Sequence, residues 1–208
     1  LAAQFDNPTD LAVKTGTGDY YVADHNNAVV RLITGTGIVT TVAGGTSGYL
    51  DATGAAAQFK TPYGIVFVGT DLFTTDTDNN MIRKIDSGFA VTTVAGVEAE
   101  GNANCDWCFF DGPTGTMSSP RNLATFGGDL YFTDMNNAVR KVVIATGVVS
   151  TVAGTGIVTG MTEASVDGTG VHAEFANPRG IAFDPAGYAF VADVNSGVLR
   201  MLSPLGVV

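Results

Sequence analysis

The chain has 208 residues, of which 45% are hydrophobic and 14% are charged, and its formal net charge is −10 at pH 7. This composition indicates a packed protein rather than a disordered one. The acidic balance disfavours nucleic acid and anionic membrane surfaces as partners, because both are bound through clustered lysine and arginine. No run approaches the roughly 18 apolar residues of a membrane-spanning helix, so we expect no membrane insertion.

Short strands separated by turns make up the first quarter of the chain. After Pro8 we expect strands at 11–13, 20–24, 28–33 and 38–43. Aromatic and β-branched residues favour these strands, and glycine or asparagine occupies the turns between them. Helical periodicity is convincing nowhere in the chain.

The same set of strands is expected three more times. The later copies cover 64–67, 72–76, 81–85 and 90–95, then 123–126, 130–134, 138–144 and 148–153, then 180–183, 189–193 and 198–202. A period in the fifties with four short strands per copy is typical of β-propeller blades. We therefore predict an all-β propeller of four-stranded antiparallel blades, with blades at about 5–52, 59–112, 117–168 and 175–208.

Several residues recur at equivalent places in the copies. They are a proline before the first strand, an aspartate ending the second and an arginine in the third: Pro8, Pro62, Pro120, Pro178; Asp24, Asp76, Asp134, Asp193; Arg31, Arg83, Arg140, Arg200. Val-Ala-Gly also recurs, at 42–44, 94–96 and 152–154. Because function usually differs between blades, we interpret the aspartates and arginines as structural pairs rather than as a ring of binding charges.

Four stretches carry a resemblance to a known family. They are Pro178-Arg179-Gly180-Ile181-Ala182, Tyr21-Val22-Ala23-Asp24, Asn79-Asn80-Met81-Ile82-Arg83-Lys84-Ile85 and Val91-Thr92-Thr93-Val94-Ala95-Gly96. They resemble the NHL-repeat family, and the resemblance covers nearly the whole chain. Because NHL repeats typically form six-bladed propellers, it implies that 1–208 is one incomplete domain of a six-bladed ring. The alternative is a four-bladed ring whose last blade is completed by another segment.

Two departures from the NHL pattern are candidate metal ligands. Two residues after each proline the family prefers glycine, but the first copy has Asp10 and the third has Asn122. Oxygen ligands near a propeller axis suit calcium, which makes calcium the one cofactor that the sequence suggests. The alternative is that each side chain caps a local turn.

The loop 97–119 contains two further features. Cys105 and Cys108 lack the other ligands that zinc needs and the helix that a redox motif opens, so we expect a small disulfide and an oxidising compartment. Trp107, Phe109 and Phe110 either dock a partner or fold back onto a blade.

The loop 155–177 is equally long and gathers ionisable side chains. They are Glu163, Asp167, His172 and Glu174, which we interpret as solvated loop charges rather than a metal or catalytic site.

No catalytic constellation stands out in the sequence, so we lean away from an enzyme. NHL-type members include scaffolds, ectodomains, RNA binders and a lyase, so the resemblance alone does not decide function. We predict a non-catalytic extracellular interaction or assembly module, secreted or part of an ectodomain, that binds a protein or glycan through one face and its long loops. The alternative is a metal-dependent lyase-like or lactonase-like propeller with its site in the central channel. A cytoplasmic RNA binder is disfavoured by the acidic balance. No signal-peptide pattern opens the chain, whose first residues match the inside of a repeat, so either the protein is cytoplasmic or the chain is an internal piece of a longer secreted one.

Overall fold

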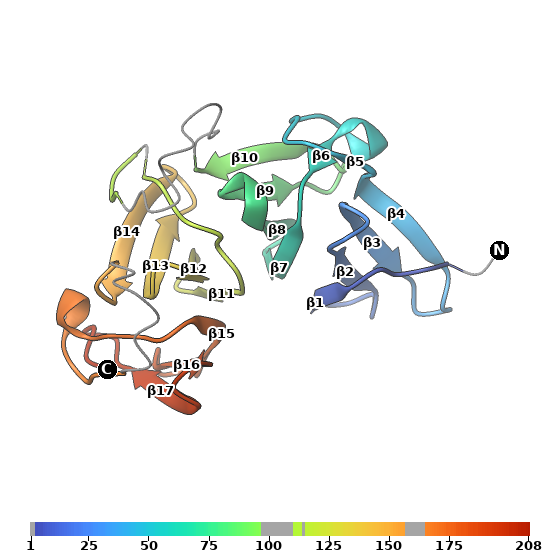
Figure 1. Ribbon diagram of the computed structural model, residues 1–208. Helices are drawn as coiled ribbons and strands as arrows, with labels where there is room; N and C mark the ends of the chain where they lie inside the picture. Colours follow the sequence, from blue (N-terminus) through green and yellow to red (C-terminus); the bar gives the residue numbers. More distant parts are fainter. Residues whose placement is uncertain (1–2, 97–109, 114, 157–164) are drawn as a thin grey trace. The chain divides into compact units, whose positions relative to one another are not determined.

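The computed structural model describes residues 3–96, 110–113, 115–156 and 165–208. Within these ranges the regular structure is β-strand, with three short 3-10 helices (Figure 1). No helix in the described part of the chain is long and apolar enough to cross a membrane. The chain divides into two compact units, Leu1–Val94 and Ala95–Val208, which are described separately.

The first unit holds two antiparallel sheets of four strands. The first blade is β1 (Pro8–Val13), β2 (Tyr20–Asp24), β3 (Val29–Ile33) and β4 (Val39–Gly44), in that spatial order. The second blade is β7 (Pro62–Val68), β8 (Asp71–Asp76), β9 (Met81–Ile85) and β10 (Val91–Ala95). The linker between them contains β5 (Thr46–Ser47), the 3-10 helix η1 (Gly54–Ala56) and β6 (Gln58–Phe59), and η2 (Thr77–Asn79) follows β8.

The second unit repeats this arrangement. The third blade is β11 (Leu123–Phe126), β12 (Asp129–Asp134), β13 (Ala138–Val143) and β14 (Val148–Ala153). The fourth blade has three strands, β15 (Pro178–Phe183), β16 (Ala189–Asp193) and β17 (Val198–Leu202), and η3 (Gly170–His172) precedes it. The predicted all-β propeller class, with its antiparallel blades, is confirmed, whereas the six-bladed total stays a prediction.

Apolar side chains fill the space between neighbouring blades within each unit. In the first unit the cluster includes Ala23 and Val30 from the first blade and Ile65 from the second, all buried. Tyr21 and Phe67 meet edge to face across this junction with ring centroids 5.1 Å apart. Because residues alternate between the two faces of a strand, each blade directs the apolar side chains of one face into the cluster between the blades.

The recurring Val-Ala-Gly sequence has a backbone cause. Gly44, Gly96 and Gly154 all have left-handed φ angles, at 90°, 95° and 107°. A Cβ atom would lie 2.3 Å from the Ala28 carbonyl oxygen at Gly44, and 2.3 Å from the Asn137 carbonyl oxygen at Gly154. Only glycine fits such a position without strain, so it ends the outer strand of each of these blades.

The third blade has a shorter turn after its aspartate. Asp134 pairs with Ala138 across the turn, whereas Asp24 pairs with Val29 and Asp76 with Met81. One residue is therefore missing from this turn, which explains why Asp134 and Arg140 are six residues apart rather than seven.

Candidate functional site

The four aspartates that end the second strands are buried, and each binds the segment that enters its own blade. Their carboxylates accept the main-chain N–H group two residues before the blade's proline, and in the second blade also the one directly before it. The contacts are Asp6 N to Asp24 Oδ1 at 2.8 Å, Lys60 N and Thr61 N to Asp76 Oδ1 at 2.9 and 3.1 Å, Ser118 N to Asp134 Oδ1 at 3.2 Å, and Ala176 N to Asp193 Oδ1 at 2.7 Å. A buried carboxylate needs such partners, so these aspartates fix the entry of the chain into each blade.

The recurring arginines lie beside these aspartates in three of the blades. The ion-pair distances are 3.1 Å for Arg83 and Asp76, 3.3 Å for Arg140 and Asp134, and 3.8 Å for Arg200 and Asp193. Three of the arginines also lie over a phenylalanine at the blade entry: Arg31 over Phe5, Arg83 over Phe59 and Arg200 over Phe175, at 5.2–5.6 Å from guanidinium carbon to ring centroid. The arginines are thus internal parts of their blades.

The three arginines that pair with the buried aspartates, Arg83, Arg140 and Arg200, each bind a second carboxylate, from the linker before the blade. Arg83 donates to Asp51 Oδ1 at 2.7 Å, Arg140 to Asp111 Oδ1 at 2.9 Å and Arg200 to Asp167 Oδ1 at 2.7 Å. Asp167, which the sequence suggested is a solvated loop charge, is thus an ion-pair partner of Arg200, and the corresponding roles of Asp51 and Asp111 were not predicted. Their recurrence 29–33 residues before the arginines was the signal that could have revealed the contact.

A threonine on the outer strand completes the binding of the linker aspartate. Asp51 accepts Thr93 N at 2.9 Å and the Thr93 hydroxyl at 3.1 Å, and Asp111 accepts Thr151 N at 3.0 Å and the Thr151 hydroxyl at 2.9 Å. We call each such arginine and threonine pair a carboxylate clamp. It holds the linker at one point against the outer strand.

The residue before each linker aspartate is apolar and exposed. Leu50, Phe110 and Val166 are 51%, 63% and 46% exposed, and we call these three residues the linker rim. The main chain beneath two of them is fixed, because Arg83 donates to the Leu50 carbonyl oxygen at 3.2 Å and Arg140 donates to the Phe110 carbonyl oxygen at 3.0 Å. The linker rim therefore presents apolar side chains from anchored backbone.

Burial perturbs two of the buried aspartates. It raises the pKa of Asp134 to about 6, against the opposing effects of the Asn136 amide and the Arg140 charge. Burial likewise raises the pKa of Asp76, against the opposing effects of Asn79, Lys60 and Arg83. In both cases the cost of removing the carboxylate from water outweighs its hydrogen bonds and charge partner.

The two predicted calcium ligands lie at junctions between blades. Asp10 Oδ2 accepts Ile65 N from the second blade at 2.9 Å, and Asp10 Oδ1 accepts Leu11 N at 2.8 Å. Asn122 Oδ1 accepts Ile181 N from the fourth blade at 3.1 Å. The two side chains therefore have the same structural task in their respective units. The calcium assignment stays a prediction.

The predicted partner-binding and disulfide residues are only partly described. Phe110 belongs to the linker rim, whereas Cys105, Trp107, Cys108, Phe109 and the loop residue Glu163 lie outside the described residues. Within the described ranges no group of three or more histidine, cysteine, aspartate or glutamate side chains is arranged to hold a metal ion. His25 instead lies edge-on to Tyr63, with ring centroids 5.8 Å apart.

Similarity to known proteins agrees with the blade architecture. No family model matches the chain. NHL repeat-containing protein 2 of Gallus gallus is 37% identical over 78 residues, which are 37% of this chain and 11% of that protein. A solved structure of a Bacteroides thetaiotaomicron protein of unknown function is 21% identical with a TM-score of 0.73, over 94% of this chain and 47% of that one. The chain is therefore similar to an NHL-repeat protein over part of its sequence, and its fold is that of a β-propeller.

Other solved structures share the fold of this chain. An auxiliary nutrient binding protein from Bacteroides thetaiotaomicron is 20% identical with a TM-score of 0.65, over 92% of this chain and 46% of its own. A streptogramin B lyase is 11% identical with a TM-score of 0.58, over 98% of this chain and 56% of its own. The chain thus spans about half the length of these structures. At such identities the likeness concerns the fold, which serves both binding proteins and enzymes.

Proposed function

We propose that this chain is a non-catalytic binding module that takes a protein or glycan partner through Phe110 of the linker rim and the long loops 97–119 and 155–177. The observation that carries the proposal is that Leu50 and Phe110 are exposed while their main chain is bonded to a buried arginine. Exposed apolar side chains on fixed backbone lose little conformational freedom on binding, which favours affinity. Aromatic residues such as Phe110 are frequent among the residues that contribute most to binding.

The internal use of charge supports binding over catalysis. Asp76 and Asp134 are fully buried and bonded to arginine, and the linker aspartates Asp51 and Asp111 are held in carboxylate clamps. These carboxylates are engaged in contacts within the blades. A nutrient binding protein among the similar structures provides an example of a binding role for this fold.

We also propose an extracellular location, as a secreted protein or an ectodomain. The acidic composition and the Cys105-Asp106-Trp107-Cys108 sequence motivate this part of the proposal. Mass spectrometry of the protein from its native source, with and without a reductant, tests it. Alkylation of both thiols before reduction would contradict it.

A binding screen tests the linker rim. The purified chain is screened against panels of extracellular protein domains and glycans, and each ligand found is titrated against the wild type and Phe110→Ser. We expect the substitution to raise Kd about tenfold or more, which corresponds to about 1.4 kcal/mol of lost binding energy. Tyr188→Ser, at an exposed aromatic residue in the turn before β16, is the matched control and should bind as the wild type does.

The same screen can contradict the proposed binding surface. The triple variant Trp107→Ser, Phe109→Ser, Phe110→Ser extends the test to the whole aromatic group of the loop. If ligands are found and neither the single nor the triple variant changes their Kd, the binding surface lies elsewhere.

A further inference from the structure

The first blade contains the parts of a carboxylate clamp. Arg31 and Thr41 face each other in the register of β3 and β4, just as Arg140 and Thr151 do in β13 and β14. Phe5 lies under the Arg31 guanidinium at 5.6 Å, as Phe59 lies under Arg83 at 5.2 Å. The donors and the aromatic support of the clamp are therefore repeated in this blade.

The first blade differs in what its arginine binds. Arg83 donates to Asp51, and Arg140 donates to Asp111. Arg31 instead donates to the Thr41 hydroxyl at 3.2 Å, and this hydroxyl corresponds to those that donate to the linker aspartate in the other two clamps. Within the described residues, no linker carboxylate is bonded to the Arg31 guanidinium or the Thr41 hydroxyl of the first blade.

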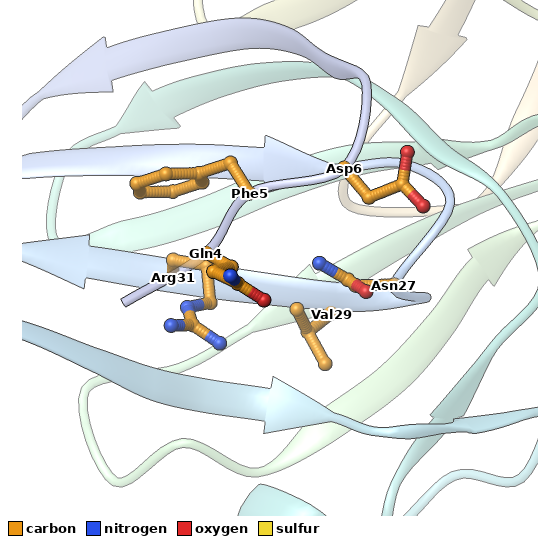
Figure 2. Close-up of a pocket in the computed structure, with 6 residues that line it drawn as sticks. All are labelled: Gln4, Phe5, Asp6, Asn27, Val29 and Arg31. Atoms are coloured by element: carbon orange, nitrogen blue, oxygen red, sulfur yellow. The ribbon is translucent and has the colours of Figure 1, made fainter. Parts of the chain in front are cut away.

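A pocket lies beside Arg31. It is lined by Gln4, Phe5, Asp6, Asn27, Val29 and Arg31. Figure 2 shows Val29 and Arg31 projecting from β3 beside Gln4 and Phe5. Whereas Arg83 and Arg140 are fully buried, Arg31 remains partly exposed. An arginine fork beside a threonine hydroxyl suits a carboxylate, which accepts several hydrogen bonds at once.

The other blades indicate where the carboxylate comes from in the sequence. The linker aspartate precedes the residue at the blade entry by six to eight positions: Asp51 and Phe59, Asp111 and Met117, Asp167 and Phe175. The residue before that aspartate is apolar in each case, namely Leu50, Phe110 and Val166. In the first blade the corresponding aspartate would precede Phe5 by six to eight positions, which places it two to four positions ahead of Leu1.

We propose that the first blade is a docking site for an aspartate of the polypeptide that precedes Leu1, and that Arg31 and Thr41 bind its carboxylate. The docked segment follows the course of the linker 49–59, with an apolar residue before the aspartate. This contact fixes the preceding polypeptide to the outer strand of the first blade. It is independent of the partner binding proposed above.

An extended chain tests the proposal. Residues 46–54 of this protein, Thr-Ser-Gly-Tyr-Leu-Asp-Ala-Thr-Gly, are placed directly ahead of Leu1, which sets the added aspartate eight positions before Phe5. The matched control carries asparagine in place of that one added aspartate. We expect the aspartate form to have a Tm about 3–6 °C above that of the asparagine form, since a charge-assisted contact is lost in the control.

The role of Arg31 is tested in the same experiment. In an Arg31→Ala background the difference in Tm between the two extensions should disappear, and Thr41→Val should reduce it. As a second measurement, the Arg31 Nε–H signal in nuclear magnetic resonance spectra should shift with the aspartate extension and keep its position with the asparagine one.

Two results would overturn the proposal. One is an equal Tm for the aspartate and asparagine extensions. The other is a difference that persists after Arg31→Ala. The complete gene product gives a further check, because an aspartate two to four residues ahead of Leu1 is expected there and its absence would contradict the assignment.

Discussion

At the scale of single residues, the blades depend on the geometry of the arginine side chain. Arg83 donates to the carbonyl oxygens of Gln58 and Leu50 and to the carboxylates of Asp76 and Asp51. Four acceptors in different directions match the planar fork of a guanidinium, and a lysine ammonium has only three donors at one atom. Because Arg83 and Asp76 are both fully buried, the Asp76 carboxylate does not recover a lost donor from water.

We expect Arg83→Lys to lower the free energy of unfolding by about 3 kcal/mol, because a buried ion pair and its neighbouring acceptors lose part of their hydrogen bonding. Urea denaturation measures the change. Lys84→Ala, which removes the partly exposed pair of Lys84 and Asp71 at 3.4 Å, is the control and should cost less than about 1 kcal/mol. Equal losses for the two variants would show that the Arg83 network contributes no more than a surface pair.

The free energy of unfolding should depend on pH through the buried side chain of Asp134. Burial raises its pKa to about 6 in the folded protein, above the roughly 3.9 of an aspartate in an unfolded chain. The folded state therefore binds this proton more tightly, so the stability that Asp134 contributes is fully present below about pH 4 and is lost as the pH rises through about 6.

The measurement compares the wild type with Asp134→Asn. The free energy of unfolding of the wild type, relative to the variant, should fall by roughly 1–3 kcal/mol between pH 4 and pH 7, which follows from the size of the pKa shift. Denaturant titrations at several pH values provide the data. A difference that stays constant or grows over this range would mean that the pKa is not raised.

At the scale of elements, neighbouring blades are joined by one side chain at the start of their inner strands. Asp10 accepts the Ile65 amide and Asn122 accepts the Ile181 amide. The second and fourth blades have Gly64 and Gly180 at the same position. The departures from the repeat that the sequence suggested as metal ligands thus hold blades together within each unit.

This arrangement predicts different results for two substitutions at Asp10. Asp10→Asn keeps an oxygen for the Ile65 amide, as Asn122 does in the third blade, so we expect a change within about 0.5 kcal/mol in the free energy of unfolding. Asp10→Ala leaves the amide without that acceptor and should cost about 1–2 kcal/mol. Thermal unfolding with and without calcium completes the test. A calcium-dependent rise in the Tm of the wild type that both variants lose would instead support the metal-ligand interpretation.

At the scale of the whole molecule, the sequence predicts the repeated blades well. Alternating apolar residues and turn residues are local signals, and the strands of all four blades lie close to their predicted positions. The carboxylate clamps were harder to predict, since Asp51 and Arg83 are far apart in sequence and meet only when the linker folds back onto its blade. The linker rim depends on the same contact. Phe110 was therefore predicted to bind a partner because it is aromatic, whereas Leu50 and Val166 were not predicted to have this role.

The alternation between an acceptor side chain and a glycine at the blade junctions has a consequence for engineering. At this position the first and second blades have Asp10 and Gly64, and the third and fourth blades have Asn122 and Gly180. In each pair the first blade supplies the acceptor and the second supplies the amide. Within each unit the two blades are therefore not interchangeable, because one supplies the acceptor side chain and the other supplies the main-chain amide. A blade moved by engineering from one position of a pair to the other would lose this contact unless the acceptor is moved with it.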